Sequence, residues 1–388
     1  MSRFPPLLEM ISELIATPSV SSVKQSLDQG NLAVIELLAS WLEDTGFDIE
    51  IMHLPGTPAK ANLIATLGRG SGGLVFAGHT DTVPYDEGKW RHDPFRLTST
   101  GDKLYGLGTS DMKSFLALAL EAVRELDADD LQHPLILLAT ADEESSMSGA
   151  RALVERKWPQ ARYALIGEPT GLRPVRMHKG ILMEAIRLSG QSGHSSDPAL
   201  GNSALEAMHL VLGTLITWRE ELQARHRNPL FAVPVPTLNL GHIHGGDNPN
   251  RICGSCELHI DLRPLPGMDL QELRGELRQR VLDILQDSGI EVNFESLFEG
   301  IPAMETPANA RIIQLAEKLT GHSPEAVAFG TEAPYLSRLG METVILGPGD
   351  IALAHQPDEY IRLDQLAPTV QLLKSMIDTV CIKGWQLL

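Results

Sequence analysis

Apolar and polar positions along the chain follow two patterns, which predict strands and helices. Three continuous apolar runs have the length of a strand and are typical of strands buried on both faces: LVFAG (74–78), LILLA (135–139) and YALIG (163–167). A fourth buried strand is predicted at TVILG (343–347). Amphipathic periodicity predicts helices at 7–16, 31–44, 112–126, 309–320 and from about 363. This alternation predicts an α/β domain whose sheet is covered by helices.

The middle of the chain follows a different order. The pattern predicts a strand, a helix, two strands, a helix and a strand, at 181–189, 203–222, 237–243, 252–263, 268–286 and 290–296. This βαββαβ order is the ferredoxin-like pattern. We therefore expect a small domain, 179–298, inserted between two segments of a larger domain, 1–178 and 299–388.

Metal-type ligands stand directly after the predicted buried strands. Ligands of open α/β sheets collect at the carboxyl ends of the strands, so side chains placed there are candidates for a shared site. The acids and histidines that follow the four strands are His79 and Asp81, then Asp142, Glu143 and Glu144, then Glu168, and finally His355. Asp111 comes from the turn before the 112–126 helix. Two imidazoles and several carboxylates suit zinc or another borderline divalent ion.

Each of these residues also has a structural alternative. Asp111 alone is equally typical of a helix N-cap, and Glu143 with Glu144 could be a solvated loop pair. The convergence of the set on one sheet edge favours a functional site. The spacing of His79 and Asp81 places a carboxylate near the imidazole, as is common for ligating histidines. Of the two adjacent glutamates, one could bind metal while the other takes a proton from a water that the metal acidifies.

Charge and hydropathy argue against nucleic acid and membranes as partners. The sequence has 32 Lys and Arg against 50 Asp and Glu, a net charge of −18, which would repel a phosphate backbone, so we expect no nucleic-acid partner. The longest apolar stretches fall far short of the roughly 18 residues that span a bilayer, so we expect no membrane span. The first residues carry Glu9 and Glu13 and no apolar signal-peptide core, which predicts a cytoplasmic location.

Glycines at 68, 70 and 73 spell GxGxxG, the dinucleotide-binding pattern. The segment runs into the predicted strand at 74–78 and not into a helix, so we expect a hairpin turn and no dinucleotide site. The sequence lacks GxSxG and GxxxxGKS/T, which removes the usual serine-hydrolase and NTP-hydrolase interpretations.

Six longer motifs follow one another along the chain: GHTDTVP (78–84), GLGTSDMK (106–113), ATADEESSMSGA (139–150), GEPT (167–170), GQSGHSSDP (190–198) and AHQPDE (354–359). With these motifs the chain resembles the co-catalytic zinc exopeptidase and deacylase family over almost its full length. The resemblance implies a zinc-exopeptidase-like catalytic domain with a central mixed sheet. It also implies that the inserted domain is a lid and that the chain forms a homodimer through it.

The resemblance further implies roles for the strand-end residues. Two divalent ions, zinc with cobalt as the alternative, would be bridged by Asp111. The ligands that complete the two sites would be His79 with Glu168, and Glu144 with His355. Glu143 corresponds to the general base, and Asp81 to the carboxylate behind His79.

Residues that do not bind metal are assigned by the same resemblance. His194 matches a lid histidine that reaches the active site of the partner subunit and stabilises the oxyanion. Arg263 and Asn250 match positions that bind the substrate α-carboxylate, which suits a guanidinium fork, although Arg263 could also be a surface strand residue. Thr331 falls in the family's substrate-contacting GT turn. As a separate hypothesis, Glu332 recognises a substrate ammonium group.

Some motifs narrow the substrate. HKG (178–180), TLNLGHIHGGD (237–247) and GTEAPY (330–335) most resemble the branch of the family that deacetylates N-acetyl-L-ornithine in arginine biosynthesis. Desuccinylating relatives read a longer diacid with extra arginines, whereas this chain has His178 and Lys179, which favours a smaller acyl group. The alternatives are desuccinylation, hydrolysis of dipeptides or other N-acyl amino acids, and a metal-binding scaffold that lacks catalysis.

Overall fold

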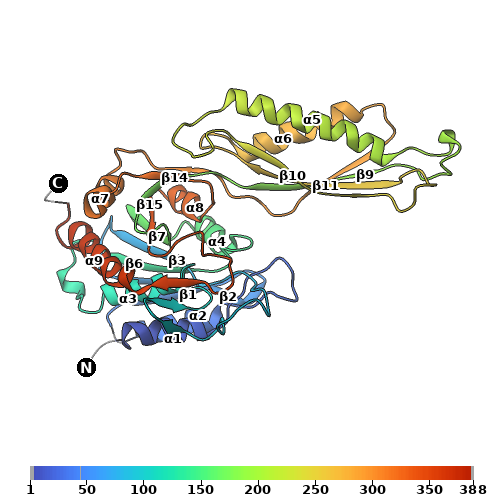
Figure 1. The fold of residues 1–388 in the computed structure, drawn as a ribbon. Coiled ribbons are helices and arrows are strands. Elements are labelled where there is room, and N and C mark those ends of the chain that lie inside the picture. The colour runs from blue at the N-terminus through green and yellow to red at the C-terminus, as the bar shows by residue number, and fades with distance from the viewer. Residues whose placement is uncertain (1–3, 44, 386–388) are drawn as a thin grey trace. The chain divides into compact units, whose positions relative to one another are not determined.

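The computed structural model describes residues 4–43 and 45–385. These residues form two compact units (Figure 1). The first unit comprises the chain up to 176, residues 306–325 and the chain from 331 onward. The second unit comprises 177–305 and 326–330. The chain therefore passes from the first unit to the second twice, once for the long segment 177–305 and once for the short segment 326–330.

The core of the first unit is a sheet that mixes parallel and antiparallel strands. From one edge, its first six strands follow the order β1 (Asp48–Leu54), β2 (Thr57–Leu67), β6 (Leu135–Thr140), β3 (Leu74–His79), β7 (Tyr163–Pro169) and β15 (Glu342–Gly347). β6, β3, β7 and β15 pair in parallel, whereas β1 with β2 and β2 with β6 pair antiparallel. Every residue of β3, β6 and β7 is buried, as expected of strands covered on both faces. The predicted mixed central sheet is confirmed.

Helices cover both faces of this sheet (Figure 1). They are α1 (Leu7–Ala16), α2 (Leu32–Leu42), α3 (Lys113–Ala122), α4 (Ser148–Arg156), α7 (Arg311–Thr320), α8 (Ala333–Arg338) and α9 (Leu366–Ile377). α3 contacts α1 and α9, and α4 contacts α8. α3 lies so close to β7 that a Cβ atom at Gly167 would fall 2.1 Å from the ring of Phe115. This close approach fixes the end of β7, which carries Glu168.

The short elements were not predicted. β4 (Thr98–Thr100), β5 (Lys103–Tyr105) and β16 (Tyr360–Arg362) form a small separate sheet. β8 (Val175–His178), β13 (Met304–Glu305) and β14 (Glu325–Val327) lie where the chain passes from one unit to the other. Strands of two to four residues are too short to show a period in the sequence.

The hairpin predicted at the glycine-rich segment is wrong. β2 and β3, which this segment connects, are not neighbours, because β6 lies between them and pairs with both. Gly68, Gly70 and Gly73 have φ angles of +82°, +109° and +92°, a region that L side chains rarely adopt. The glycines let the chain cross one strand before it enters β3.

The second unit has the predicted βαββαβ order. Its elements are β9 (Leu182–Ser189), α5 (Ala204–Arg225), β10 (Thr237–Gly245), β11 (Ser255–Arg263), α6 (Leu270–Leu285) and β12 (Glu291–Ser296). The strands form an antiparallel sheet in the order β10-β11-β9-β12, and α5 and α6 pack side by side on one face (Figure 1). Trp218 and Leu277 are fully buried in the core of this unit. The ferredoxin-like prediction is confirmed.

α5 is a helix of 22 residues, yet it is not apolar enough to cross a membrane. None of the other helices within residues 4–43 and 45–385 combines the necessary length and apolar character.

Candidate metal centre

The carboxyl ends of three parallel strands bring the predicted ligands to one edge of the first unit's sheet. His79 is the last residue of β3 and lies opposite Thr140, the last residue of β6. The turn after β6 carries Glu143 and Glu144, and β7 carries Glu168 near its end. Because these strands run parallel, side chains that follow them converge.

Asp111 lies between two imidazoles. Its Oδ1 is 3.0 Å from Nε2 of His79, and its Oδ2 is 3.5 Å from Nε2 of His355. The N-cap position of α3 belongs to Met112, and no side chain caps this helix. Asp111 therefore does not act as a helix cap. A carboxylate with one oxygen toward each imidazole has the arrangement of a ligand shared by two ions.

Three glutamates complete the groups around these imidazoles. Oε2 of Glu144 lies 3.0 Å from Nε2 of His355. Two triads have ligand atoms within 4.8 Å of one another: His79 with Glu143 and Glu168, and His79 with Asp111 and Glu144. The structure thus brings together the five predicted metal ligands and the predicted base.

The cluster carries more negative than positive charge in a buried setting. Burial and the neighbouring carboxylates raise the pKa of Glu143 and of Glu168 well above the ordinary range. Hydrogen bonds to Asp111 and Glu144 raise the pKa of His355 to about 10, so the cluster attracts positive charge. Crowded buried carboxylates repel one another unless a cation neutralises them. The imidazole and carboxylate donors therefore fit divalent ions such as Zn²⁺ or Co²⁺.

Asp81 holds the Glu143–Glu144 turn against the end of β3. Its carboxylate accepts the backbone N–H groups of Glu143 at 3.2 Å and of Glu144 at 3.0 Å. Nδ1 of His79 lies 3.0 Å from the backbone oxygen of Asp81 and 3.8 Å from its carboxylate. The backbone carbonyl is thus the nearer partner of the imidazole, while the carboxylate positions the two glutamates.

Asp142, the third acid of this turn, is bound to the fold. Its carboxylate lies 2.7 Å from Nζ of Lys60 and accepts the hydroxyl groups of Ser21 at 2.8 Å and of Ser148 at 2.6 Å. Asp142 therefore anchors the turn and leaves Glu143 and Glu144 to face the site.

Glu359 belongs to the site and was not predicted. Its buried carboxylate accepts the backbone N–H groups of Gly108, Ser110 and Asp111 at 3.2, 2.7 and 3.0 Å. It follows His355 closely in the chain, so one short segment supplies both an imidazole and the group that holds the Asp111 loop. The motif AHQPDE ends on Glu359, and this was the available signal.

Glu359→Gln is expected to weaken metal binding without unfolding the chain. The amide has one acceptor oxygen in place of two and turns an NH₂ group toward the loop, so Asp111 loses its fixed position. Loss of such an outer partner of a ligand typically lowers metal affinity or activity about 10–100-fold. Competition with a chelator measures the affinity, and Glu317→Gln, at an exposed position of α7, is the control. Equal affinities in both variants would contradict the positioning role.

Thr331 and Glu332 lie inside the first unit. Thr331 is fully buried, and its hydroxyl oxygen accepts the N–H of Ala333 at 3.1 Å. Glu332 is 1% exposed, and its Oε2 accepts the hydroxyl of Thr140 at 2.7 Å, while Oε1 has no hydrogen-bond partner among the described residues. Burial raises the pKa of Glu332 to about 7. A substrate group would reach this carboxyl only if neighbouring side chains moved, so the contact with an ammonium group stays a prediction.

His194 and Asn250 belong to two loops of the second unit that pair with each other. His194 is exposed, forms a β-bridge with Arg251, and has its Nδ1 at 2.7 Å from the Ser196 hydroxyl. The N–H of Ser195 donates to the carbonyl of Asn250 at 3.0 Å. The two predicted lid residues are therefore close to each other.

Arg263 lies at the other end of the same sheet. It is the last residue of β11, and its Nε donates to both carboxylate oxygens of Asp261, at 2.9 and 3.0 Å. β11 starts at Ser255, and a rise of about 3.3 Å per residue makes the strand roughly 26 Å long. Asn250 lies beyond the start of β11. One chain therefore does not bring Arg263 and Asn250 to the same carboxylate.

His178 and Lys179 are both buried. Nδ1 of His178 lies 2.8 Å from the carbonyl oxygen of Lys179, and Nε2 has no hydrogen-bond partner among the described residues. Nζ of Lys179 donates to the carbonyl of Val235 at 2.7 Å. Burial lowers the pKa of both side chains, that of His178 to about 4.

His178→Gln is expected to make the protein less sensitive to mild acid. The folded protein keeps His178 neutral down to about pH 4, whereas the unfolded chain binds a proton below about pH 6.5. Its contribution to the free energy of unfolding is therefore fully present above pH 6.5 and falls by about 1.4 kcal/mol per pH unit as the pH drops toward 4. Urea unfolding should show a stability loss from pH 7 to pH 5 that is about 2 kcal/mol smaller in the variant. His53→Gln, at an exposed histidine, should behave as wild type, and equal losses in all three proteins would refute the idea.

Two imidazoles and four carboxylates at one edge of an α/β sheet form the kind of donor set that metal-dependent hydrolases use. Residues 75–379 match the model of peptidase family M20/M25/M40. The match spans well over half of the chain, so the chain belongs to this family. The resemblance to the co-catalytic zinc exopeptidase and deacylase family is confirmed at the level of peptidase family M20/M25/M40.

Solved structures with the same fold cover nearly the whole chain. An M20 family metallo-carboxypeptidase, Sso-CP2 from Sulfolobus solfataricus, is 18% identical with a TM-score of 0.76, covering 96% of this chain and 99% of that one. The aminopeptidase PepT from Bacillus cereus is 21% identical with a TM-score of 0.74, covering 96% and 98%. The Bacillus subtilis YXEP protein, a dinuclear metal-binding M20 peptidase, is 16% identical with a TM-score of 0.67, covering 96% and 97%. These likenesses confirm the predicted zinc-exopeptidase-like fold.

Proposed function

We propose that the protein is an acetylornithine deacetylase, which hydrolyses N2-acetyl-L-ornithine to L-ornithine and acetate in arginine biosynthesis. The observation that carries the hydrolytic part is the Asp111 carboxylate between two imidazoles, with Glu143 beside them. The choice of substrate rests on the motifs at 178–180, 237–247 and 330–335. The proposal places the enzyme in the cytoplasm.

Two divalent ions would be held by His79, Asp111 and Glu168 and by Asp111, Glu144 and His355, with zinc favoured by donor type and cobalt as the alternative. When bound, such ions polarise the scissile carbonyl and make a nearby water more acidic. Glu143 takes a proton from the attacking water as the water oxygen adds to the acetyl carbon. Glu143 then delivers this proton to the leaving nitrogen as the C–N bond breaks, which yields acetate and the free α-amino group.

Glu143 is well placed for this exchange. It is half-buried, and Asp81 fixes its backbone through the N–H bond at 3.2 Å. Burial and the neighbouring carboxylates raise the pKa of this carboxyl, which favours the transfer of a proton through it.

Substrate contacts are proposed for both units. Arg263 would bind the α-carboxylate through its guanidinium fork. Thr331 would contact the acyl amino acid, and Glu332 would recognise the side-chain ammonium of ornithine. If Glu332→Gln leaves KM for N-acetyl-L-ornithine unchanged, Glu332 has no part in recognition.

We also propose that a second copy of the chain completes each active site. His194 would stabilise the oxyanion in the partner's site, with Asn250 beside it, whereas Arg263 lies about 26 Å away along β11. Two copies could present both ends of this sheet to one substrate. The edge position of β10 and the exposed Leu205 and Ile216 of α5 support pairing through the second unit.

Mixing two inactive variants is expected to restore activity. His194→Ala removes the group that a chain lends to its partner, and Glu143→Gln removes the base of its own site. A mixed dimer would contain one site with an intact Glu143 and an intact histidine from the partner. Co-expression of the two chains should yield a kcat well above that of either variant alone. Activity no higher than the sum of the two variants would contradict the shared site.

Substrate competition separates the proposal from its rivals. Because similar structures include a carboxypeptidase and an aminopeptidase, dipeptide hydrolysis is the second candidate; desuccinylase and aminoacylase activities follow. We expect chelator-treated protein reloaded with Zn²⁺ or Co²⁺ to show a higher kcat/KM for N-acetyl-L-ornithine than for N-succinyl-diaminopimelate or a dipeptide. Preference for another substrate would overturn the substrate assignment alone. Metal-independent turnover would overturn the mechanism, and no turnover of any of the three would favour a metal-binding scaffold.

A further inference from the structure

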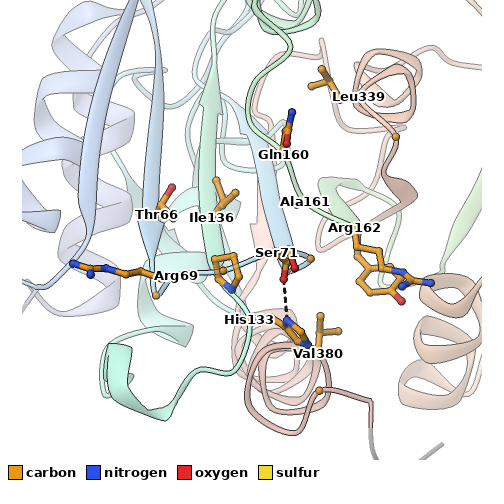
Figure 2. A pocket seen from close by; sticks show the side chains of 18 of the residues that line it. Thr66, Arg69, Ser71, His133, Ile136, Gln160, Ala161, Arg162, Leu339 and Val380 are labelled. Atoms are coloured by element: carbon orange, nitrogen blue, oxygen red, sulfur yellow. Dashed lines mark hydrogen bonds between the residues drawn. The ribbon is translucent and has the colours of Figure 1, made fainter.

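A pocket lies at the opposite edge of the first unit's sheet (Figure 2). It has a volume of about 720 Å³ and is lined by the glycine-rich segment 68–73, by residues 160–163 and by the chain around Trp385. β3, β6 and β7 begin at this edge, and their other ends carry the metal-centre residues. A strand of six residues rising about 3.3 Å each separates the two edges by roughly 17 Å. The pocket is therefore distinct from the metal centre.

Three buried donors of this pocket have no hydrogen-bond partner among the described residues. They are the indole Nε1–H groups of Trp158 and Trp385 and the phenol O–H of Tyr163. An indole nitrogen can only donate, and buried donors in folded proteins are normally paired. All three atoms are buried, as Oε1 of Glu332 is, so a ligand reaches them only if neighbouring side chains move.

Two arginines of the pocket stand over its aromatic rings. The guanidinium of Arg162 lies 5.6 Å from the ring centroid of Tyr163, and that of Arg311 lies 4.9 Å from that of Trp385. The two rings are 5.0 Å apart, so the four side chains form one cluster. Neither guanidinium has an ion-pair partner among residues 4–43 and 45–385. Stacking orients a guanidinium without neutralising it, which leaves its N–H groups available to an anion.

The pocket lining lacks carboxylates within the described part of the chain, although acidic residues outnumber basic ones by 50 to 32. Glu342, which accepts the N–H of Ile312 at 3.3 Å, is turned to the start of α7 and does not line the pocket. In Figure 2 the side chain of Arg69 points away from Arg162, so Arg162 and Arg311 are the cations of the cluster. A cationic pocket in an acidic protein attracts anions.

We propose that this pocket binds a small organic anion. Its carboxylate or phosphate group pairs with Arg162 and Arg311, the two cations that stand over the aromatic rings of the pocket. The volume lies within the range of about 300–1,000 Å³ that is typical of small-molecule sites. The anion binds independently of the hydrolytic reaction, because none of these residues belongs to the metal centre.

Tryptophan fluorescence can test the proposal, since two of the five tryptophans line the pocket. The metal-loaded full-length protein is titrated with inorganic phosphate and, separately, with glutarate, which distinguishes phosphate from carboxylate ligands. The double variant Arg162→Gln, Arg311→Gln is expected to bind the preferred anion at least about tenfold more weakly, because two charge-assisted contacts are lost. Tyr163→Phe keeps the ring under Arg162 and removes only a buried phenol group, so it should bind the anion nearly as wild type does.

Arg96→Gln is the matched control, because Arg96 is an exposed arginine of the same unit that does not line the pocket. It should bind as wild type. An anion could also bind at the metal centre, which is unchanged in these variants. The part of the binding that disappears in the Arg162→Gln, Arg311→Gln variant is therefore assigned to the pocket. Equal affinity in wild type and the double variant, or no saturable response to either anion, would overturn the proposal. Unchanged circular dichroism and unchanged hydrolysis without added anion show that the variants are folded.

Discussion

Glu143→Gln is expected to lower kcat for N-acetyl-L-ornithine by about 10²–10⁴-fold, the usual loss when a general acid–base group is removed. The amide keeps the size of the side chain but cannot take a proton from water or return it to the leaving amine. The ligand atoms of His79 and Glu168 stay in place, so the metal content should change little. Steady-state kinetics together with metal analysis of the same sample measure both quantities.

Glu155→Gln is the matched control for this experiment, because Glu155 is an exposed carboxylate on α4. It should retain the wild-type kcat. A metal-loaded Glu143→Gln protein with normal kcat would contradict the role of base. A loss of activity that parallels a loss of metal would assign Glu143 to ligation instead.

Asp111→Ala is expected to abolish the binding of both proposed ions, whereas His355→Ala should abolish the binding of only one. Asp111 faces His79 at 3.0 Å and His355 at 3.5 Å, so both sites depend on it. His355 lies against Asp111 and Glu144, which belong to one of the two proposed sites, so its loss should affect that site alone. Equilibrium dialysis against Zn²⁺ counts the ions, and the activity of Asp111→Ala should fall to that of the chelator-treated protein.

The two variants are compared with Asp287→Ala, which removes an exposed carboxylate of the second unit and should retain both ions. An Asp111→Ala protein that still holds one ion tightly would show that Asp111 is not shared. If Asp111→Ala and His355→Ala lose the same number of bound ions, the two sites do not form separately.

The parallel strands and most ligands could be predicted because a strand buried on both faces appears in the sequence as a continuous apolar run. β3, β6 and β7 stand in the sequence as LVFAG, LILLA and YALIG. In a parallel sheet the residues after such runs share one edge, and this rule led to His79, Glu143 and Glu144. His355 follows its strand only after a short loop, and Asp111 comes from a turn whose position depends on the rest of the fold. The role of Asp111 as a shared ligand was predicted from the resemblance of whole motifs.

Tertiary hydrogen bonds and strand neighbours could not be predicted. The carboxylate of Asp81 lies beside the imidazole of His79 as expected, but it also accepts two backbone N–H groups of the turn after β6, which the sequence did not reveal. Glu359 acts in the same way on the Asp111 loop. The false hairpin at 68–73 has a related cause, because periodicity reveals a strand but not which strand pairs beside it. The motifs likewise did not reveal that Arg263 and Asn250 lie at opposite ends of one sheet.

The ligands of the metal centre come from widely separated segments, and this couples ion supply to folding. More than half of the 388-residue chain separates His79 from His355. In an unfolded chain these donors are far apart, so high ion affinity belongs to the folded state alone. By mass action, an ion present at 100 times its Kd stabilises the folded chain by about 2.7 kcal/mol. Removal of the proposed ions is therefore expected to do more than stop turnover: it should lower Tm and expose the chain to proteolysis.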